Sequence, residues 1–222
     1  MKQTFEHKLT SLAREEDGAT LTELAIVVSS LLLMVMGAVE FGRFGYNEVL
    51  AQKATDLAAR TAAVRPAVCA GVPDTFTPGF GAAPRFGTLC RVGSAGETCA
   101  AIPQTDMPTC TLASPAAGDA AASAAADEIW ETISPLLPRL AQRSNVEITY
   151  THDPNIGFLG GPYTPIVTVE LTDIPYVTIT PLGELARIAT ANSTGGEAPD
   201  TFTFPNMSAS IPGEDLGQGI GS

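Results

Sequence analysis

The longest apolar run of the chain lies near its N-terminus and predicts a membrane-spanning helix. Sixteen consecutive residues from Leu24 to Val39 carry no charge, and Leu21 extends the run. A helix from Ala19 to Val39 would be about 31 Å long, which matches the hydrocarbon core of a bilayer. Because such a helix satisfies its backbone polar groups internally, we interpret the run as a single span, with Ser29 and Ser30 able to bond back to their own helix. A buried core helix is the alternative.

The helical pattern continues beyond this run as far as Arg65. Apolar residues recur among many alanines, at Phe41, Phe44, Val49, Leu57 and Val64. Pro66 then favours an end to the helix, because the residue before a proline is disfavoured in helical conformation. One helix over residues 19–65 would be about 70 Å long, half in lipid and half outside as a stalk.

The C-terminal part predicts a small acidic α+β domain over residues 119–222. A helical stripe fills 119–143, where Asp119 or Ser123 can cap and Pro135 and Pro138 kink or split the helix. Strand patterns follow at 146–151, 166–171 and 176–180, then a possible short helix at 182–190 and a last strand at 201–211, broken at Pro205. The predicted fold class is α+β: a long N-terminal transmembrane helix, one further helix and a 3–4 stranded antiparallel sheet.

The segment between stalk and domain, residues 66–118, contains all four cysteines. It is rich in Pro, Gly, Ala and Thr without a sustained period, so we interpret it as a loop. An even number of cysteines outside a membrane helix indicates two disulfides in an oxidising compartment, with free thiols as the alternative. Three pairings are possible, and the sequence does not choose among them. The candidates are Cys69, Cys90, Cys99 and Cys110.

Charge limits the partners of the chain. Its 222 residues have a formal net charge of −12, and after residue 65 there are 5 basic side chains, all Arg, against 16 acidic ones. Such a body has little with which to neutralise phosphates, which argues against nucleic acid and against docking on anionic lipid. The balance suits a soluble, exported domain.

Glu23 is out of place, because a carboxylate just inside an apolar run costs about 2 kcal/mol or more. Thr20 and Glu23 have the spacing of a capping box, which would explain the carboxylate structurally. A functional explanation is cleavage after Gly18, which makes Ala19 the first residue. Its new ammonium would lie one turn from Glu23 and could pair with that carboxylate or with one in an adjacent subunit.

Glycine, four residues, glutamate and a long apolar run resemble the processing site of type IV prepilins. The stretch Gly18–Leu24, followed at the far end of the run by Glu40-Phe41-Gly42-Arg43, more narrowly resembles the TadE-like family, pilin-like proteins of the Tad (tight adherence, Flp) pilus system. The resemblance covers residues 14–60. Leu24 departs from it, since many TadE-like proteins have Phe after the glutamate.

The resemblance implies a leader, residues 1–18, removed by a prepilin peptidase between Gly18 and Ala19, and a role for Glu23 in assembly. Its implied partners are the prepilin peptidase, other Tad pilus subunits, inner-membrane assembly proteins and inner-membrane lipid. Lys and Arg lie on both flanks of the span, so charge does not set the orientation. The cysteines and the cleavage place the N-terminus in the cytoplasm of a bacterial cell and the body in the periplasm or outside. A conventional signal peptide lacks an A-x-A site here.

Catalysis finds little support, and we expect no enzyme, no cofactor and no metal. The chain has two His residues and lacks the common nucleophile, zinc and nucleotide motifs. We interpret His152-Asp153 as a solvated pair beside a turn. The leading hypothesis is therefore a membrane-anchored, pilin-like component of a Tad-type pilus or secretion apparatus. The alternative is a single-pass anchored extracytoplasmic binding module that is not cleaved at Gly18.

Overall fold

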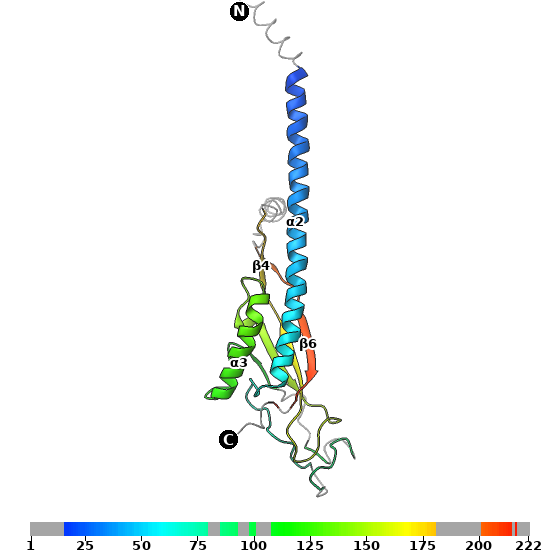
Figure 1. The fold of residues 1–222 in the computed structure, drawn as a ribbon, viewed down its shortest axis with the longest axis vertical. Helices are drawn as coiled ribbons and strands as arrows, with labels where there is room; N and C mark the ends of the chain where they lie inside the picture. The colour runs from blue at the N-terminus through cyan, green and yellow to red at the C-terminus, as the bar shows by residue number, and fades with distance from the viewer. Residues whose placement is uncertain are drawn as a thin grey trace, which may run out of the picture. The chain divides into compact units, whose positions relative to one another are not determined.

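The computed structural model describes residues 16–79, 85–92, 98–100, 108–180, 201–214 and 216 (Figure 1). Contacts divide the chain into two compact units. The first comprises Met1–Phe44 and Thr178–Asp200, and the second comprises Gly45–Val177 and Thr201–Ser222. The architecture confirms the predicted α+β class, with a long N-terminal apolar helix, a further helix and a four-stranded antiparallel sheet.

Helix α2, Glu16–Ala63, contributes to both units. It ends two residues before the predicted Arg65, with the amide of Val64 donating to the Thr61 carbonyl. In the second unit its buried face consists of alanines spaced three or four residues apart, which are fully buried: Ala51, Ala54, Ala58 and Ala62. Such spacing lines one face of a helix, and the short side chains let another element approach its backbone closely.

Helix α3, Ala120–Ile133, begins at the predicted cap. The Asp119 carboxylate accepts hydrogen bonds from the amides of Ala121 and Ala122 at 2.8 and 3.1 Å. The helix predicted over 119–143, with a kink or split at Pro135 and Pro138, is split in the structure, where α3 ends at Ile133. A 3₁₀ turn, η2 (Ser134–Leu136), follows, and Arg143–Asn145 forms a separate 3₁₀ turn, η3. Proline at the second position of η2 explains the break, because its ring cannot continue an α-helix.

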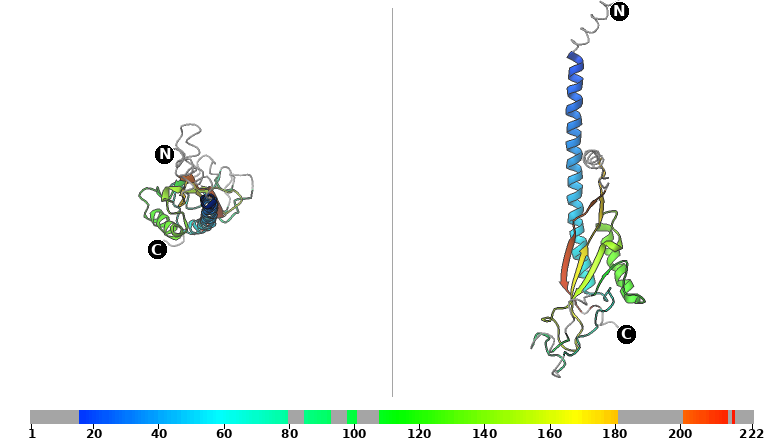
Figure 2. Two further views of the ribbon diagram at one scale, coloured as in Figure 1. Left: turned by 90° about the horizontal axis from the view of Figure 1, so that it is seen from above. Right: turned by 180° about the vertical axis from the view of Figure 1, so that it is seen from behind.

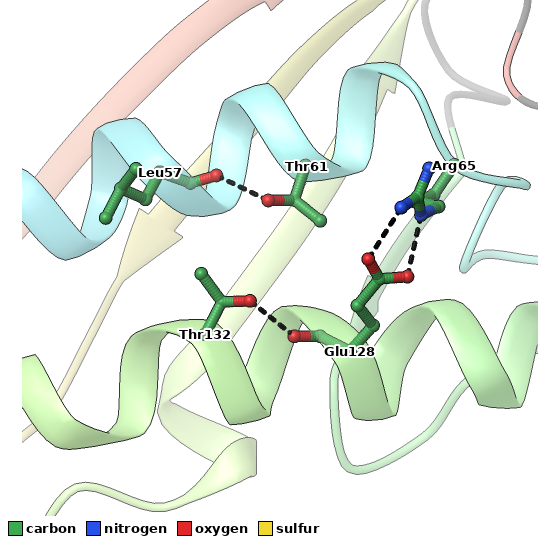
Figure 3. A network of polar contacts seen from close by, with 5 residues as sticks. All are labelled: Leu57, Thr61, Arg65, Glu128 and Thr132. Carbon is green, nitrogen blue, oxygen red and sulfur yellow. Dashed lines mark hydrogen bonds and ion pairs between the residues drawn. The ribbon is translucent and has the colours of Figure 1, made fainter.

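The main sheet has the strand order β1-β2-β3-β6, with every pair antiparallel. Its strands are β1 (Thr109–Thr111), β2 (Val146–Thr151), β3 (Ile166–Leu171) and β6 (Met207–Pro212). Val146, Ile148 and Tyr150 alternate with half-buried polar residues along β2, as predicted for a strand with one covered face. In Figure 3, α3 and the last turns of α2 lie in front of the strands. The right-hand view of Figure 2 shows the molecule from behind, where the strands come forward.

Two of the predicted strands do not lie together in the single antiparallel sheet that the sequence predicts. The candidate at 176–180 is β4 (Pro175–Val177), and it pairs with β5 (Thr201–Thr203) in a separate two-stranded sheet. The last strand is split as expected around Pro205, but its halves, β5 and β6, belong to different sheets. The possible helix at 182–190 lies outside the described residues. Within the predicted loop 66–118, residues 109–111 form β1 and join the sheet.

Polar contacts join α3 to the residues after α2 (Figure 3). The Arg65 guanidinium donates to both oxygens of Glu128, at 2.6 and 2.7 Å. This pairing lowers the pKa of Glu128 below its ordinary value. Both side chains are more than two-fifths exposed, so solvent screens the attraction and the pair contributes mainly geometry. The residues after α2 are also joined to β2, because the amide of buried Val68 donates to the Tyr150 hydroxyl at 2.9 Å.

Candidate functional site

The candidate site begins with the apolar surface of α2 in the first unit. Among the described residues, α2 is the one helix long and apolar enough to cross a membrane, over Thr20–Ala63. None of its most apolar window is buried. Leu24 is 58 % exposed and Met34 is 76 % exposed. Since burying one such side chain is worth about 2 kcal/mol, this surface requires lipid or other helices around it.

The polar groups inside this surface are few and are mostly satisfied locally. The Ser29 hydroxyl donates to the Ala25 carbonyl at 2.7 Å, as the sequence predicts. Glu23 is exposed, and its side chain makes no ion pair or hydrogen bond to another described residue. If the surrounding Leu21, Leu24 and Ile26 were in lipid, a charged carboxylate at this position would be costly without a partner cation.

The backbone around the predicted cleavage site is helical. Helix α2 begins at Glu16, so Gly18 and Ala19 lie in its first turn and Glu23 lies two turns in. The capping-box interpretation of Thr20 and Glu23 is therefore wrong for the intact chain, because an N-cap must precede the helix. Removal of residues 1–18 would instead make Ala19 the first residue of the helix, about 6 Å along the axis from Glu23.

A second carboxylate, Glu40, lies directly after the apolar run. It is only 9 % exposed, and one of its oxygens accepts from Arg43 Nη2 at 2.7 Å. Its other oxygen accepts from two consecutive backbone amides, those of Ile179 and Thr180, at 3.1 and 3.3 Å. In the sequence, Glu40 and Arg43 were named only as part of the resemblance to the TadE-like family. Their i, i+3 spacing could have predicted an ion pair on one face of the helix.

The four predicted cysteines form two disulfides in the second unit. Cys69 bonds to Cys110, with Cα atoms 5.5 Å apart, and Cys90 bonds to Cys99, with Cα atoms 5.2 Å apart. The first disulfide ties the chain after α2 to β1. The second lies in a small buried cluster with Phe76, Leu159 and Tyr163.

His152 is not the solvated turn residue that the sequence suggested. It is 8 % exposed, its Nδ1 lies 3.2 Å from the Tyr163 hydroxyl, and the two rings are stacked. Burial lowers the pKa of His152, against an opposing effect of Asp153, and burial also raises the pKa of Tyr163 to about 12. The Asp153 carboxylate accepts from the Asn155 amide at 2.8 Å and closes the turn. The contacts among these side chains are those of a packed core.

Among the described residues, no three His, Cys, Asp or Glu side chains are placed to hold a metal ion.

Comparison with known proteins gives one match: the family model described as TadE-like protein matches residues 18–60. The match contains Gly18, Ala19, Glu23, Glu40 and Arg43. Neither the curated proteins nor the solved structures give a match to the chain.

Proposed function

We propose that this chain, which is TadE-like over residues 18–60, is a membrane-anchored structural component of a Tad-type pilus or secretion apparatus. The observation that carries the proposal is the exposed apolar surface of α2 inside the matched segment. A helix of this length with no buried apolar window has the properties of a single span. The role is that of a pseudopilin or minor pilin, not of an enzyme.

A prepilin peptidase cuts this chain between Gly18 and Ala19. The cut lies in the first helical turn, so the peptidase must open that turn to reach the peptide bond. Gly18 weakens the turn, because glycine in a helix costs about 1 kcal/mol relative to alanine. The leader of residues 1–18 stays in the cytoplasm.

Glu23 pairs with an ammonium after cleavage. The ammonium of Ala19, on the same subunit or a neighbouring one, is the nearest cation that processing supplies, about one turn away. Pairing offsets the cost of a carboxylate at the edge of the bilayer, and pairing between subunits sets the register of their helices.

The body of the protein lies in the periplasm or outside the cell, with α2 held in the bacterial inner membrane until assembly. Two disulfides support an oxidising compartment, and they include all four cysteines. The acidic charge of the body supports interaction with protein subunits over nucleic acid. The partners are the prepilin peptidase, other Tad pilus subunits and inner-membrane assembly proteins.

Cleavage is tested by measuring the mass of the N-terminal peptide of the protein purified from native membranes. We expect an N-terminus at Ala19, and we expect Gly18→Ala to leave the leader attached. An intact N-terminus at Met1 in the wild-type protein would contradict processing and favour the anchored binding module. An N-terminus beyond Val39 would contradict the membrane anchor itself.

The role of Glu23 is tested by Glu23→Ala, with Glu48→Ala as the matched control. Glu48 is a half-buried carboxylate on the same helix, outside the apolar run. We expect Glu23→Ala to be cut at Gly18 but to enter the assembled pilus poorly, whereas Glu48→Ala is both cut and incorporated. Normal incorporation of Glu23→Ala would refute the pairing with an ammonium.

A further inference from the structure

The buried carboxylate of Glu40 fixes a segment that is distant in the sequence. Residues Thr178–Thr180 follow β4 in the chain and belong to the same compact unit as the apolar part of α2. Glu40 holds this segment by its backbone, through the amides of Ile179 and Thr180. Two consecutive amides on one carboxylate oxygen are charge-assisted hydrogen bonds, which are stronger than bonds between neutral groups.

The position of the carboxylate places this segment beside the last turn of the apolar run. Side chains on a helix lean toward its N-terminus, so a residue covers the surface of the turn before its own Cα. The Glu40 carboxylate therefore lies beside the turn that ends at Val39. The amides of Ile179 and Thr180, 3.1 and 3.3 Å from that carboxylate, lie at the same level.

Large apolar side chains at this level are exposed. Ile179 is 73 % exposed, Phe41 is 80 % exposed and Val39 is 62 % exposed. Val39 and Phe41 flank Glu40 in the sequence and Ile179 is held at Glu40 by its amide, so the three exposed side chains lie at one level of the helix and together form a belt of apolar surface. This surface is continuous with the apolar run of α2, whose own surface requires lipid, and Arg43 beside Glu40 supplies a cation at the same end. Arginine near the end of a span can extend its side chain to the level of the headgroups.

We propose that Ile179 and Phe41 form a second membrane contact, in which Glu40 holds the Thr178–Thr180 backbone at the bilayer surface and Ile179 inserts at the level of the headgroups. The occupant of this surface is the lipid bilayer. The attraction is apolar, because the chain is too acidic to be drawn to anionic lipid. The inference rests on the proposed function, since it takes Ala19–Val39 as a span. It adds that the membrane contacts a segment 139 residues away from Glu40 in the sequence.

The test uses tryptophan fluorescence of the full chain in phosphatidylcholine vesicles that carry bromine at a shallow or a deep position of the acyl chain. Trp130 is the only tryptophan, so Trp130→Phe provides a silent background. In that background we expect the shallow bromine to quench Ile179→Trp more than the deep one. Val28→Trp, in the middle of the apolar run, should show the reverse order. Val92→Trp, an exposed position in the second unit, should not be quenched.

The Glu40 variants test how the segment is held. We expect Glu40→Ala to abolish the quenching of Ile179→Trp while that of Val28→Trp is unchanged. Glu40→Gln keeps an oxygen acceptor for the two amides and should retain part of the quenching. Quenching of Ile179→Trp that survives Glu40→Ala in full would overturn the role of Glu40.

The outcomes separate this inference from the function on which it rests. If Val28→Trp is quenched and Ile179→Trp behaves like Val92→Trp, the span stands and the second contact is overturned. If Val28→Trp is not quenched either, the anchor itself is refuted and the second contact falls with it.

Discussion

Loss of the Tyr150 hydroxyl should destabilise the second unit measurably. In the structure this hydroxyl accepts a hydrogen bond from the amide of Val68. Both residues are almost completely buried, with Tyr150 1 % exposed and Val68 0 % exposed. Tyr150→Phe keeps the ring and removes only the acceptor, so the Val68 amide is left buried without its partner. A buried unsatisfied donor costs about 1–3 kcal/mol, and we expect the free energy of unfolding to fall by that amount.

The assay is urea unfolding of the detergent-solubilised chain, followed by the fluorescence of Trp130, which lies on α3 in the same unit. Tyr46→Phe is the matched control, since it removes a hydroxyl from a side chain that is 65 % exposed. The control should be within about 0.5 kcal/mol of the wild-type protein, as is usual for surface substitutions. An equal result for Tyr150→Phe, at an unchanged denaturant slope, would refute the reasoning.

Alkaline titration gives a second measure of the same hydroxyl. Burial raises the pKa of Tyr150 from 10.0 to about 12, with the bond from Val68 acting in the opposite direction. A raised pKa means that the folded state holds its proton more tightly than the unfolded state. The contribution of protonated Tyr150 to the free energy of unfolding is therefore complete below pH 10 and is lost as the pH rises to about 12. A shift of two pKa units corresponds to about 2.7 kcal/mol. Tyr150→Phe should be less sensitive to pH in this window.

Two further predictions concern buried His152 and the two disulfides. Because burial lowers the pKa of His152 below 6.5, the unfolded state binds the proton more tightly, and the free energy of unfolding should fall as the pH drops through 6.5 toward the folded-state pKa. His152→Phe should reduce this pH dependence when unfolding is measured between pH 5 and 8. An unchanged pH dependence would contradict the role of buried His152. Replacing both cysteines of Cys69–Cys110, which are 41 residues apart, should cost about 4 kcal/mol by loop entropy, against about 2.6 kcal/mol for Cys90–Cys99, 9 residues apart. Thermal unfolding of the two double variants should keep that order, and a reversed order would contradict the entropic argument.

Local pattern was enough to predict several elements. Strand β2 alternates between apolar and polar residues, β3 does so from Val167 onward, and Asp119 stands at the start of a helical stripe. These signals lie within a few residues of the element they specify. Strand β1 gave no such signal, because Thr109–Thr111 is only three residues long and its strand character depends on pairing with β2. The partner of β4 was also missed, since pairing with β5 is a tertiary choice.

The candidate site divides in the same way. Gly18, Ala19 and Glu23 could be named as candidates from the sequence because the proposed processing site is defined by spacing along the chain, and their roles stay predictions. The bonds of Glu40 were not, because two of its donors are backbone amides 139 and 140 residues away, and every residue but proline has an amide. His152 was misjudged for a similar reason: Asp153 beside it suggested a turn, whereas burial comes from Phe76 and Tyr163.

The two ends of α2 show how one helix can suit two environments. Charge already separates them, because Leu24–Val39 carries none whereas the other end includes Glu48, Lys53, Asp56 and Arg60. Side-chain size separates them further: the exposed end carries Leu, Ile, Val and Met, whereas the buried face at the other end is alanine at positions 51, 54, 58 and 62. Alanine gains little from lipid but permits close packing against other elements. Glu40 stands between the two ends, and it is the one buried carboxylate in the part of the chain that the structure describes. The change from an exposed apolar surface to a packed one is thus encoded in charge and in residue volume, and the buried carboxylate of Glu40 lies where the two meet.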